Sequence, residues 1–179
     1  GQTGGMDSNA TSSDAQDPEA LSEALQQVED ILLGKSGESE VADELLRHIQ
    51  TRVTDEGLIV ELFDLPDARL FRGETAQPTQ LLRDLATVIV GAADLVVNDL
   101  AIAGHTHARA VGVANAPVWD ITADRANAMR ALMKDRGLGH SRVDRVTGHA
   151  DRRPAVRNPV AIRNNRLEVI FLRSDFKTK

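Results

Sequence analysis

Apolar residues recur at helical spacing in two short stretches near the N-terminus. The first covers residues 17–33, where Asp17 is a suitable N-cap, Pro18 takes the first helical position and Gly34 marks the end. Its apolar positions share one helix face: Leu21, Leu25, Val28, Ile31 and Leu32. The second amphipathic stretch covers residues 41–49. Because each predicted helix carries an apolar stripe, each needs a partner surface elsewhere in the protein.

From residue 52 onward, strand and helix periodicities alternate. A turn at residues 55–57 interrupts the alternating run at 52–63, which indicates a strand or a tight hairpin. The remaining expected elements are helices at 77–91 and 122–136 and strands at 99–107, 142–150 and 166–173. This alternation predicts an α/β (α+β) fold with helices packed on one face of a mixed sheet.

Composition divides the chain into three segments. Residues 1–16 are small and polar without periodicity, so we expect a disordered tail. Residues 17–50 hold the two N-terminal helices as a helical linker, and residues 51–175 form the main domain. Aromatic residues are only 3% of the 179 residues, so the core must be built from Leu, Val, Ile and Ala.

The net charge of −6 hides a polarity along the chain. Residues 1–50 carry eleven acidic and two basic residues, whereas residues 140–179 carry four acidic and ten basic residues. The basic segment has only Phe171 and Phe176 for base stacking, so we expect no nucleic-acid partner. The absence of cysteine excludes disulfides and thiolate metal ligands. With no membrane-spanning apolar run, no signal peptide and no initiating Met, we expect a soluble fragment of a longer protein.

Two histidines on one predicted strand raise the possibility of a metal site. His105 and His107 are two residues apart, so both rings are expected on the same face, where His140 or the His149–Asp151 pair would complete a zinc site. Unliganded histidines are common at such positions, and this interpretation is favoured. No nucleophile elbow or glycine-rich phosphate loop is present, and no carboxylate pair stands out, so we expect no enzyme.

One arginine has an unusual position in the predicted helix at 122–136. If Thr122 or Asp120 is the N-cap, Arg125 lies in the first turn, where a cation opposes the helix dipole. Free helix N–H groups and a guanidinium together form a receptor for a carboxylate or phosphate. The alternative is that Arg125 pairs with an internal acid such as Asp151 or Glu168, and the residues alone leave both open.

Four segments in order resemble one known family. They are "GHTH" at 104–107, "VWDITADRA" at 118–126, "GHADRRP" at 148–154 and "NNRLEVI" at 164–170. These segments resemble the GHTD, NxxLSxxRA, glycine-containing strand-end and NRRxEI motifs of OmpA-like peptidoglycan-binding domains. Residues 55–71 resemble the form found in MotB-type flagellar stator proteins, and the resemblance covers about residues 50–173.

The resemblance implies a mixed four-stranded sheet with helices on one face and non-covalent binding of the peptidoglycan peptide stem. In the family, the arginine at the helix start and the aspartate of GHTD hold the carboxylate and amine of diaminopimelate. Arg125 matches that arginine, but His107 replaces the aspartate and Val118 replaces the asparagine of the helix motif. The residues that the resemblance places at the ligand are Arg125, His107, Thr106, Asp124, Ile121 and Arg166. For Arg166, pairing with acids of the sheet is the alternative.

The resemblance also implies the setting of the domain. It implies the periplasmic domain of an inner-membrane protein that forms a homodimer and joins a channel-forming stator partner subunit through a transmembrane helix absent from this sequence. No cofactor, metal or catalysis is expected. The alternatives are a generic OmpA- or Pal-type outer-membrane anchor, a zinc-dependent cell-wall enzyme and a purely structural dimerisation module.

Overall fold

Strands and helices alternate along the chain, as the periodicity predicts. A computed structural model describes residues 18–34, 42–109 and 118–173. The strands are β1 (Ile49–Thr54), β2 (Gly57–Phe63), β3 (Leu100–His105), β4 (Val143–Gly148) and β5 (Arg166–Leu172). The helices are α1 (Pro18–Leu32), α2 (Asp43–Leu46), α3 (Gln80–Ala93) and α4 (Val118–Asp135), with short 3-10 helices η1 (His140–Arg142) and η2 (Ile162–Asn164).

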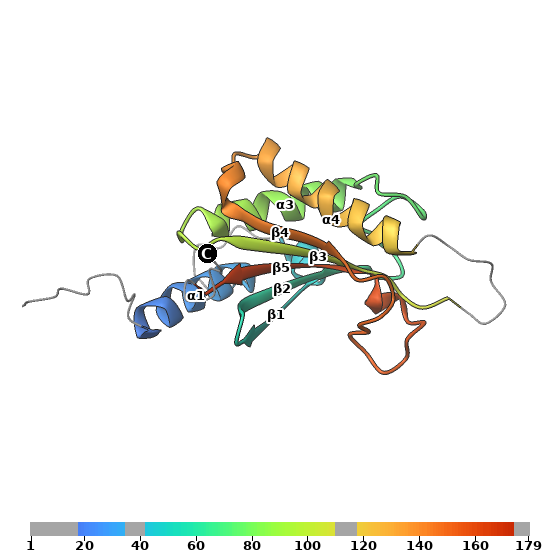
Figure 1. The fold of residues 1–179 in the computed structure, drawn as a ribbon, viewed down its shortest axis with the longest axis horizontal. Coiled ribbons are helices and arrows are strands. Elements are labelled where there is room, and N and C mark those ends of the chain that lie inside the picture. The colour runs from blue at the N-terminus through green and yellow to red at the C-terminus, as the bar shows by residue number, and fades with distance from the viewer. Residues whose placement is uncertain (1–17, 35–41, 110–117, 174–179) are drawn as a thin grey trace, which may run out of the picture.

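The strands form one mixed sheet in the order β1-β2-β5-β3-β4 (Figure 1). β5 lies antiparallel between β2 and β3, whereas β4 is parallel to β3 because the chain crosses over through α4. The mixed α+β class is therefore confirmed. The sheet has five strands rather than the expected four, since residues 49–63 form a paired hairpin with Thr54 opposite Gly57. A Cβ at Gly57, where φ is +141°, would collide with the Phe171 carbonyl oxygen, so only glycine allows this close return.

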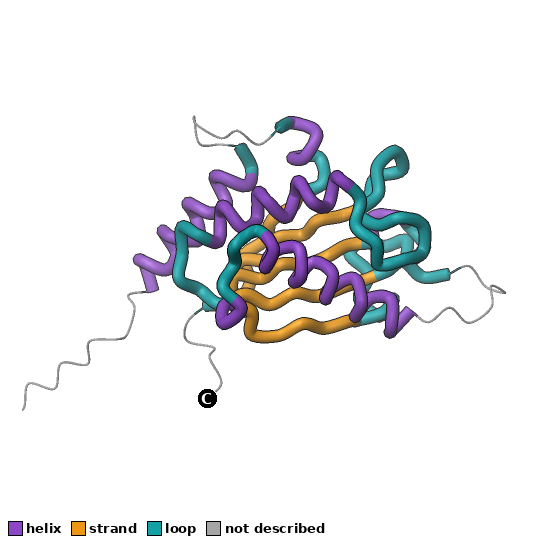
Figure 2. The backbone as a smooth tube through the Cα atoms, turned by 90° about the horizontal axis from the view of Figure 1, so that it is seen from above, coloured by secondary structure: helices purple, strands orange, loops and turns teal. Residues whose placement is uncertain are grey.

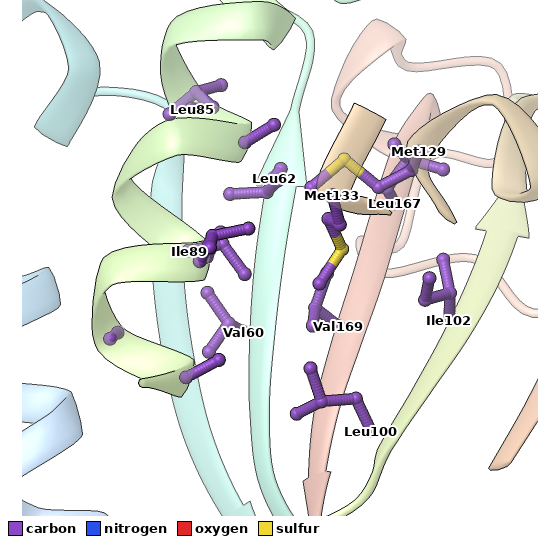
Figure 3. Packing of buried hydrophobic residues seen from close by; sticks show 14 of the residues in the cluster. Val60, Leu62, Leu85, Ile89, Leu100, Ile102, Met129, Met133, Leu167 and Val169 are labelled. Atoms are coloured by element: carbon purple, nitrogen blue, oxygen red, sulfur yellow. The ribbon is translucent and has the colours of Figure 1, made fainter. Parts of the chain in front are cut away.

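The alternation of side chains along each strand creates two different faces. α1, α3 and α4 lie over one face, which Figure 2 shows from above. Residues of the strands and of α3 and α4 that meet in this core include Val60, Leu62, Leu85, Ile89, Leu100, Ile102, Met129, Met133, Leu167 and Val169 (Figure 3). We call the opposite side the far face. It carries a small apolar cluster of Ile59, Ala101, Ile170 and Leu172 together with charged side chains.

The N-terminal helices differ in how closely they follow the sequence prediction. In α1, Leu25, Val28 and Leu32 are buried in the main core, as the apolar stripe requires. The second amphipathic stretch is mostly not helical, because α2 has only four residues and Ile49 already pairs with Leu62 in the hairpin. The predicted tail at residues 1–16 lies outside the described residues.

The third helix begins later than its apolar pattern suggests. The pattern predicts a start at residue 77, whereas α3 begins at Gln80 because the Thr79 side chain accepts a hydrogen bond from the Leu82 N–H at 3.4 Å and caps the helix. The helix then continues to Ala93 and buries one side against the sheet.

Candidate ligand-binding site

A pocket of about 430 Å³ opens where β3 and β5 meet the start of α4. Four segments contribute to it: the loop after β2, the residues that follow β3, the first half of α4 and the residue before β5. Its lining residues are Asp64, Arg69, Gly73, Glu74, Thr106, His107, Arg109, Ile121, Arg125 and Asn165. We call this cavity the Arg125 pocket.

Glycines at two strand ends determine how closely α4 approaches the sheet. A Cβ on Gly104 would collide with the Thr122 carbonyl oxygen, and a Cβ on Gly148 would lie 2.5 Å from the Ala123 nitrogen. The Thr122 hydroxyl also accepts a hydrogen bond from the Ala150 N–H at 3.0 Å. The first half of α4, which carries Ile121 and Arg125, is therefore fixed against the ends of β3 and β4.

Arg125 reaches the pocket from the interior of α4, not from its first turn. The helix begins at Val118, so Arg125 lies seven residues later, about two turns in. The expectation that Thr122 or Asp120 caps the helix is therefore wrong, and with it the conflict between Arg125 and the helix dipole. The Thr122 hydroxyl instead donates to the Val118 carbonyl one turn earlier, at 2.9 Å.

The Arg125 guanidinium is buried and partly committed to backbone. Its side chain is only 8% exposed, and it donates to the carbonyls of Thr75 and Gly73 at 2.9 and 3.1 Å. Its Cζ lies 5.0 Å from the Phe71 ring centroid, a cation–π distance. Burial lowers the pKa of Arg125, whereas the nearby carboxylate of Asp64 raises it. The side chain remains a cation at neutral pH.

Asn165 organises the opposite wall of the pocket. Its amide oxygen accepts hydrogen bonds from the Thr106 hydroxyl at 2.8 Å, from the His107 N–H at 2.8 Å and from His107 Nδ1 at 2.7 Å. Because an amide oxygen only accepts, the His107 ring carries its proton on Nδ1. The Asn165 amide nitrogen donates to Asp64 at 3.3 Å. One side chain thus orders both residues that follow β3.

The pocket contains charges of both signs. Arg109 pairs with Glu74 at 2.7 Å, and Arg69 lies 3.8 Å from Asp64. Burial raises the pKa of Asp64, although the hydrogen bond from the Leu70 N–H opposes this. The hydrogen bond from Arg109 lowers the pKa of Glu74. Three guanidinium groups and two carboxylates in one cavity suit a ligand that is itself zwitterionic.

Four of the six residues predicted at the ligand meet in this pocket: Thr106, His107, Ile121 and Arg125. Asp124 is exposed on α4 and does not line the pocket. Arg166 lies on the far face, where it is 3.4 Å from Glu168 and donates to the Arg153 carbonyl at 2.7 Å. This environment matches its alternative reading as a partner for acids of the sheet.

The sequence reasoning missed most of the wall formed by the loop after β2. Asp64 and Arg69 fall within residues 55–71, which carry part of the family resemblance, but that resemblance gave neither of them a role at the ligand, and Glu74 lies beyond this segment. These residues reach the pocket only because that loop packs near α4 in the folded protein.

The two histidines considered for a metal site point to different places. β3 ends at His105, so His107 leaves the strand and bonds to Asn165, and the expectation that both rings share a face is wrong. His105 instead stacks on His149 with ring centroids 4.8 Å apart. His140 is exposed in η1. Among the described residues, no three His, Asp or Glu side chains lie close enough to hold a metal ion.

The chain is similar in sequence to a known bacterial motility protein. Motility protein B of Escherichia coli K12 is 30% identical over 128 residues, which is 70% of this chain and 42% of that protein. The chain thus spans less than half of the curated relative that it matches. No family model matches the chain.

Solved structures show the same fold. The periplasmic domain of Helicobacter pylori MotB superposes with a TM-score of 0.60 at 16% identity, over 79% of this chain and 84% of that chain. The cell wall anchor of the T6SS from Pseudomonas aeruginosa gives a TM-score of 0.60 at 21% identity, over 80% and 96% of the two chains. The chain carries an OmpA-like, MotB-like domain. The predicted family resemblance is therefore confirmed, and the Arg125 pocket is a feature of this MotB-like domain.

Proposed function

We propose that this MotB-like domain binds peptidoglycan non-covalently in the Arg125 pocket and thereby anchors a flagellar motor stator to the cell wall. The observation that carries the proposal is the convergence of Thr106, His107, Ile121 and Arg125, from two separate motifs, in one pocket of mixed charge. The relative in E. coli is named as a motility protein, and a structural neighbour is described as a cell wall anchor. Both descriptions support this function.

The charges of the pocket match the chemistry of the proposed ligand. The free end of a diaminopimelate side chain carries a carboxylate and an ammonium group. Arg125 and Arg109 supply guanidinium donors for the carboxylate. A histidine at position 107 provides no negative charge for the ammonium, but the carboxylates of Asp64 and Glu74 line the same cavity. We propose that these two acids take the role that the family gives to the aspartate of GHTD.

The whole-protein setting is part of the same proposal. The MotB neighbour is a periplasmic domain, which supports a periplasmic location on an inner-membrane protein for this chain. No helix among the described residues is long and apolar enough to cross a membrane. We further propose a homodimer that works with a channel-forming stator partner subunit and performs no catalysis. The helical linker at residues 17–50 would control when the domain reaches the wall, and displacement of α1 from the core would accompany that change.

A general cell-wall anchor outside the flagellar motor is the second candidate. The structural likeness to the T6SS cell wall anchor favours it, because that fold is shared at 21% identity. Both candidates place peptidoglycan in the same pocket and differ in what the rest of the protein is attached to. A motility assay in a strain deleted for the chromosomal gene distinguishes them, since only a stator anchor is needed for swimming.

Co-sedimentation with purified sacculi tests the pocket. We expect the wild-type domain to pellet with sacculi and Arg125→Gln to bind roughly tenfold or more weakly, since a charge-assisted hydrogen bond contributes about 1.5–3 kcal/mol. Arg130→Gln is the matched control, because Arg130 lies on the same helix outside the pocket and bonds Asn127. Both variants remove one positive charge.

A second variant separates loss of binding from loss of folding. Arg125 bonds two backbone carbonyls, so Arg125→Gln needs a circular dichroism spectrum and a urea midpoint beside each binding curve. Arg109→Gln changes a 26% exposed side chain that pairs only with Glu74 among the described residues, so it should keep the fold and still weaken binding. Equal binding by wild type, Arg109→Gln and Arg125→Gln would refute the site, and no binding by the wild type would refute the anchoring function.

A further inference from the structure

A second cavity, of about 510 Å³, lies on the far face of the sheet. Its floor is a row of paired apolar residues in which Ile170 lies between Ile59 on β2 and Ala101 on β3. Ala101 and Ala103 are small, which leaves the hollow above β3. The segment after β4 lies at one end of the strands (Figure 1) and contributes Arg153, Pro154 and Ala155 to the wall of the cavity. This far-face pocket shares no lining residue with the Arg125 pocket.

Positive charge predominates in the walls of the far-face pocket. Four guanidinium groups and two carboxylates line it, from Arg52, Arg145, Arg153, Arg166, Glu56 and Glu168. The carboxylates are already paired: Glu168 lies 3.4 Å from both Arg52 and Arg166, and Glu56 lies 2.6 Å from Arg145. Arg153 pairs with no acid among the described residues. The cavity therefore has an excess of two positive charges even with both of its histidines neutral.

Buried polar atoms in this pocket lack hydrogen-bond partners. His105 is 3% exposed and Arg166 is 5% exposed, yet Nδ1 of His105 and Nε of Arg166 have no hydrogen-bond partner within the described structure. His105 Nε2 is 3.4 Å from Glu168, and Arg166 Nε is 3.9 Å from Glu61. Leaving a buried polar group without a hydrogen bond is energetically unfavourable. A ligand that accepts hydrogen bonds from these groups would recover that energy.

The stacked ring of His149 adds a further polar group at the same wall. It lies parallel to His105 within 18° and is less buried than that residue. Burial lowers the pKa of His149, and the neighbouring charges of His105 and Arg153 lower it further. An anion placed here would meet the positive charge of Arg153 and could accept a hydrogen bond from an imidazole N–H.

We propose that the far-face pocket is a second binding site, for a small organic oxyanion. The phosphate or carboxylate head lies against His105, Arg153 and Arg166, and the apolar part lies on the floor of Ile59 and Ala101. The volume is in the range of small-molecule sites, which is about 300–1,000 Å³. The site is independent of peptidoglycan binding, because it uses the opposite side of the sheet from the helices.

Titration with phenyl phosphate, followed by NMR of the imidazole resonances, tests this proposal. We expect saturable shifts of His105 and His149 and weaker binding of inorganic phosphate, which lacks the apolar part. A parallel titration with benzoate identifies the preferred head group. Saturable binding of either ligand supports the site, and the ligand with the lower Kd shows whether phosphate or carboxylate is preferred. Absence of saturable shifts with both ligands would overturn the proposal. If inorganic phosphate bound as tightly as phenyl phosphate, the proposed contact between the ligand and the apolar floor would be refuted.

Neighbouring arginines provide a matched pair of variants. Arg153→Gln should weaken binding about tenfold, the effect of losing one charge-assisted hydrogen bond. Arg152→Gln removes the same charge from an exposed neighbour that does not line the pocket, so its affinity should stay within about twofold of wild type. Arg125→Gln should also leave phenyl phosphate binding unchanged. Equal weakening by Arg152→Gln and Arg153→Gln would show only diffuse surface charge and refute the site.

Discussion

Replacement of Gly148 by alanine tests how α4 is fixed on the sheet. The new Cβ would lie 2.5 Å from the Ala123 nitrogen and 2.7 Å from the Thr122 hydroxyl oxygen. An ordinary contact begins at 3.4 Å, so the helix must move by about 3.4 − 2.5 = 0.9 Å. The nearest atom belongs to the helix backbone, which cannot rotate away as the end of a flexible side chain could.

The energetic cost follows from this forced shift. Inserting a methyl group into a well-packed contact typically costs about 1–3 kcal/mol. With a loss of about 2 kcal/mol and an m-value of about 2 kcal/mol/M, the urea midpoint falls by about 1 M. Because Arg125 lies one turn after Thr122, the same shift should also weaken binding to sacculi.

Urea unfolding followed by far-UV circular dichroism measures the effect. Gly91→Ala is the control, since Gly91 is exposed on α3 and an added Cβ meets nothing within 4 Å. There the substitution should stabilise the domain by about 0.5–1 kcal/mol, because alanine is the better helix former. If Gly148→Ala unfolds at or above the wild-type midpoint, the close approach of α4 to β4 is wrong.

Two further predictions concern the far face and the loop beside it. Burial opposes ionisation of Glu168, but contacts with His105, Arg166 and Arg52 outweigh it and lower its pKa to about 2, from 4.5. This depressed pKa contributes up to about 3 kcal/mol of stability above pH 4.5, and that stability is lost as the pH falls toward 2. Glu168→Gln should therefore make the urea midpoint less dependent on pH between 4.5 and 2. A dependence as steep as in the wild type would contradict this assignment. Asn164 is fully buried, and its amide oxygen accepts a hydrogen bond from the Ala155 N–H at 2.7 Å. Asn164→Ala should therefore speed hydrogen exchange of the Ala155 amide. Asn164→Asp keeps an acceptor oxygen and should preserve the protection of that amide. Unchanged exchange in Asn164→Ala would refute the role of Asn164 in holding this loop.

Local patterns predicted the fold better than they predicted the pocket. The strand predicted at 99–107 is present as β3, in which Ala101 and Ile102 belong to opposite faces because a strand fixes the direction of every second side chain. The start of α4 was misplaced because Thr122 resembles a cap in sequence, while in the structure its hydroxyl bonds the preceding turn of the helix and Ala150, just after β4. No local pattern could predict that Asp64 would lie near Arg125, since their contact depends on the packed fold.

The charged residues of the far face likewise could not be assigned to a pocket from the sequence alone. Arg166 stands directly beside Asn165 in the sequence, and the two residues point to different pockets because consecutive residues of an extended chain face opposite ways. A motif that includes both residues therefore cannot say which one meets the ligand. Only the register of β5 against its neighbours makes that distinction.

The strand register has a mechanical consequence for a domain that we propose to hold a motor in place. The chain enters the sheet at Ile49, whose partner Leu62 is adjacent to Phe63. Phe63 pairs with Arg166, which in turn pairs with His105, the last residue of β3 before the Arg125 pocket. Tension applied at the start of β1 thus reaches the Arg125 pocket, the proposed wall attachment, through one terminal row of backbone hydrogen bonds. Most of the sheet and its helices lie off this load path, so the domain could resist pulling without deforming its core.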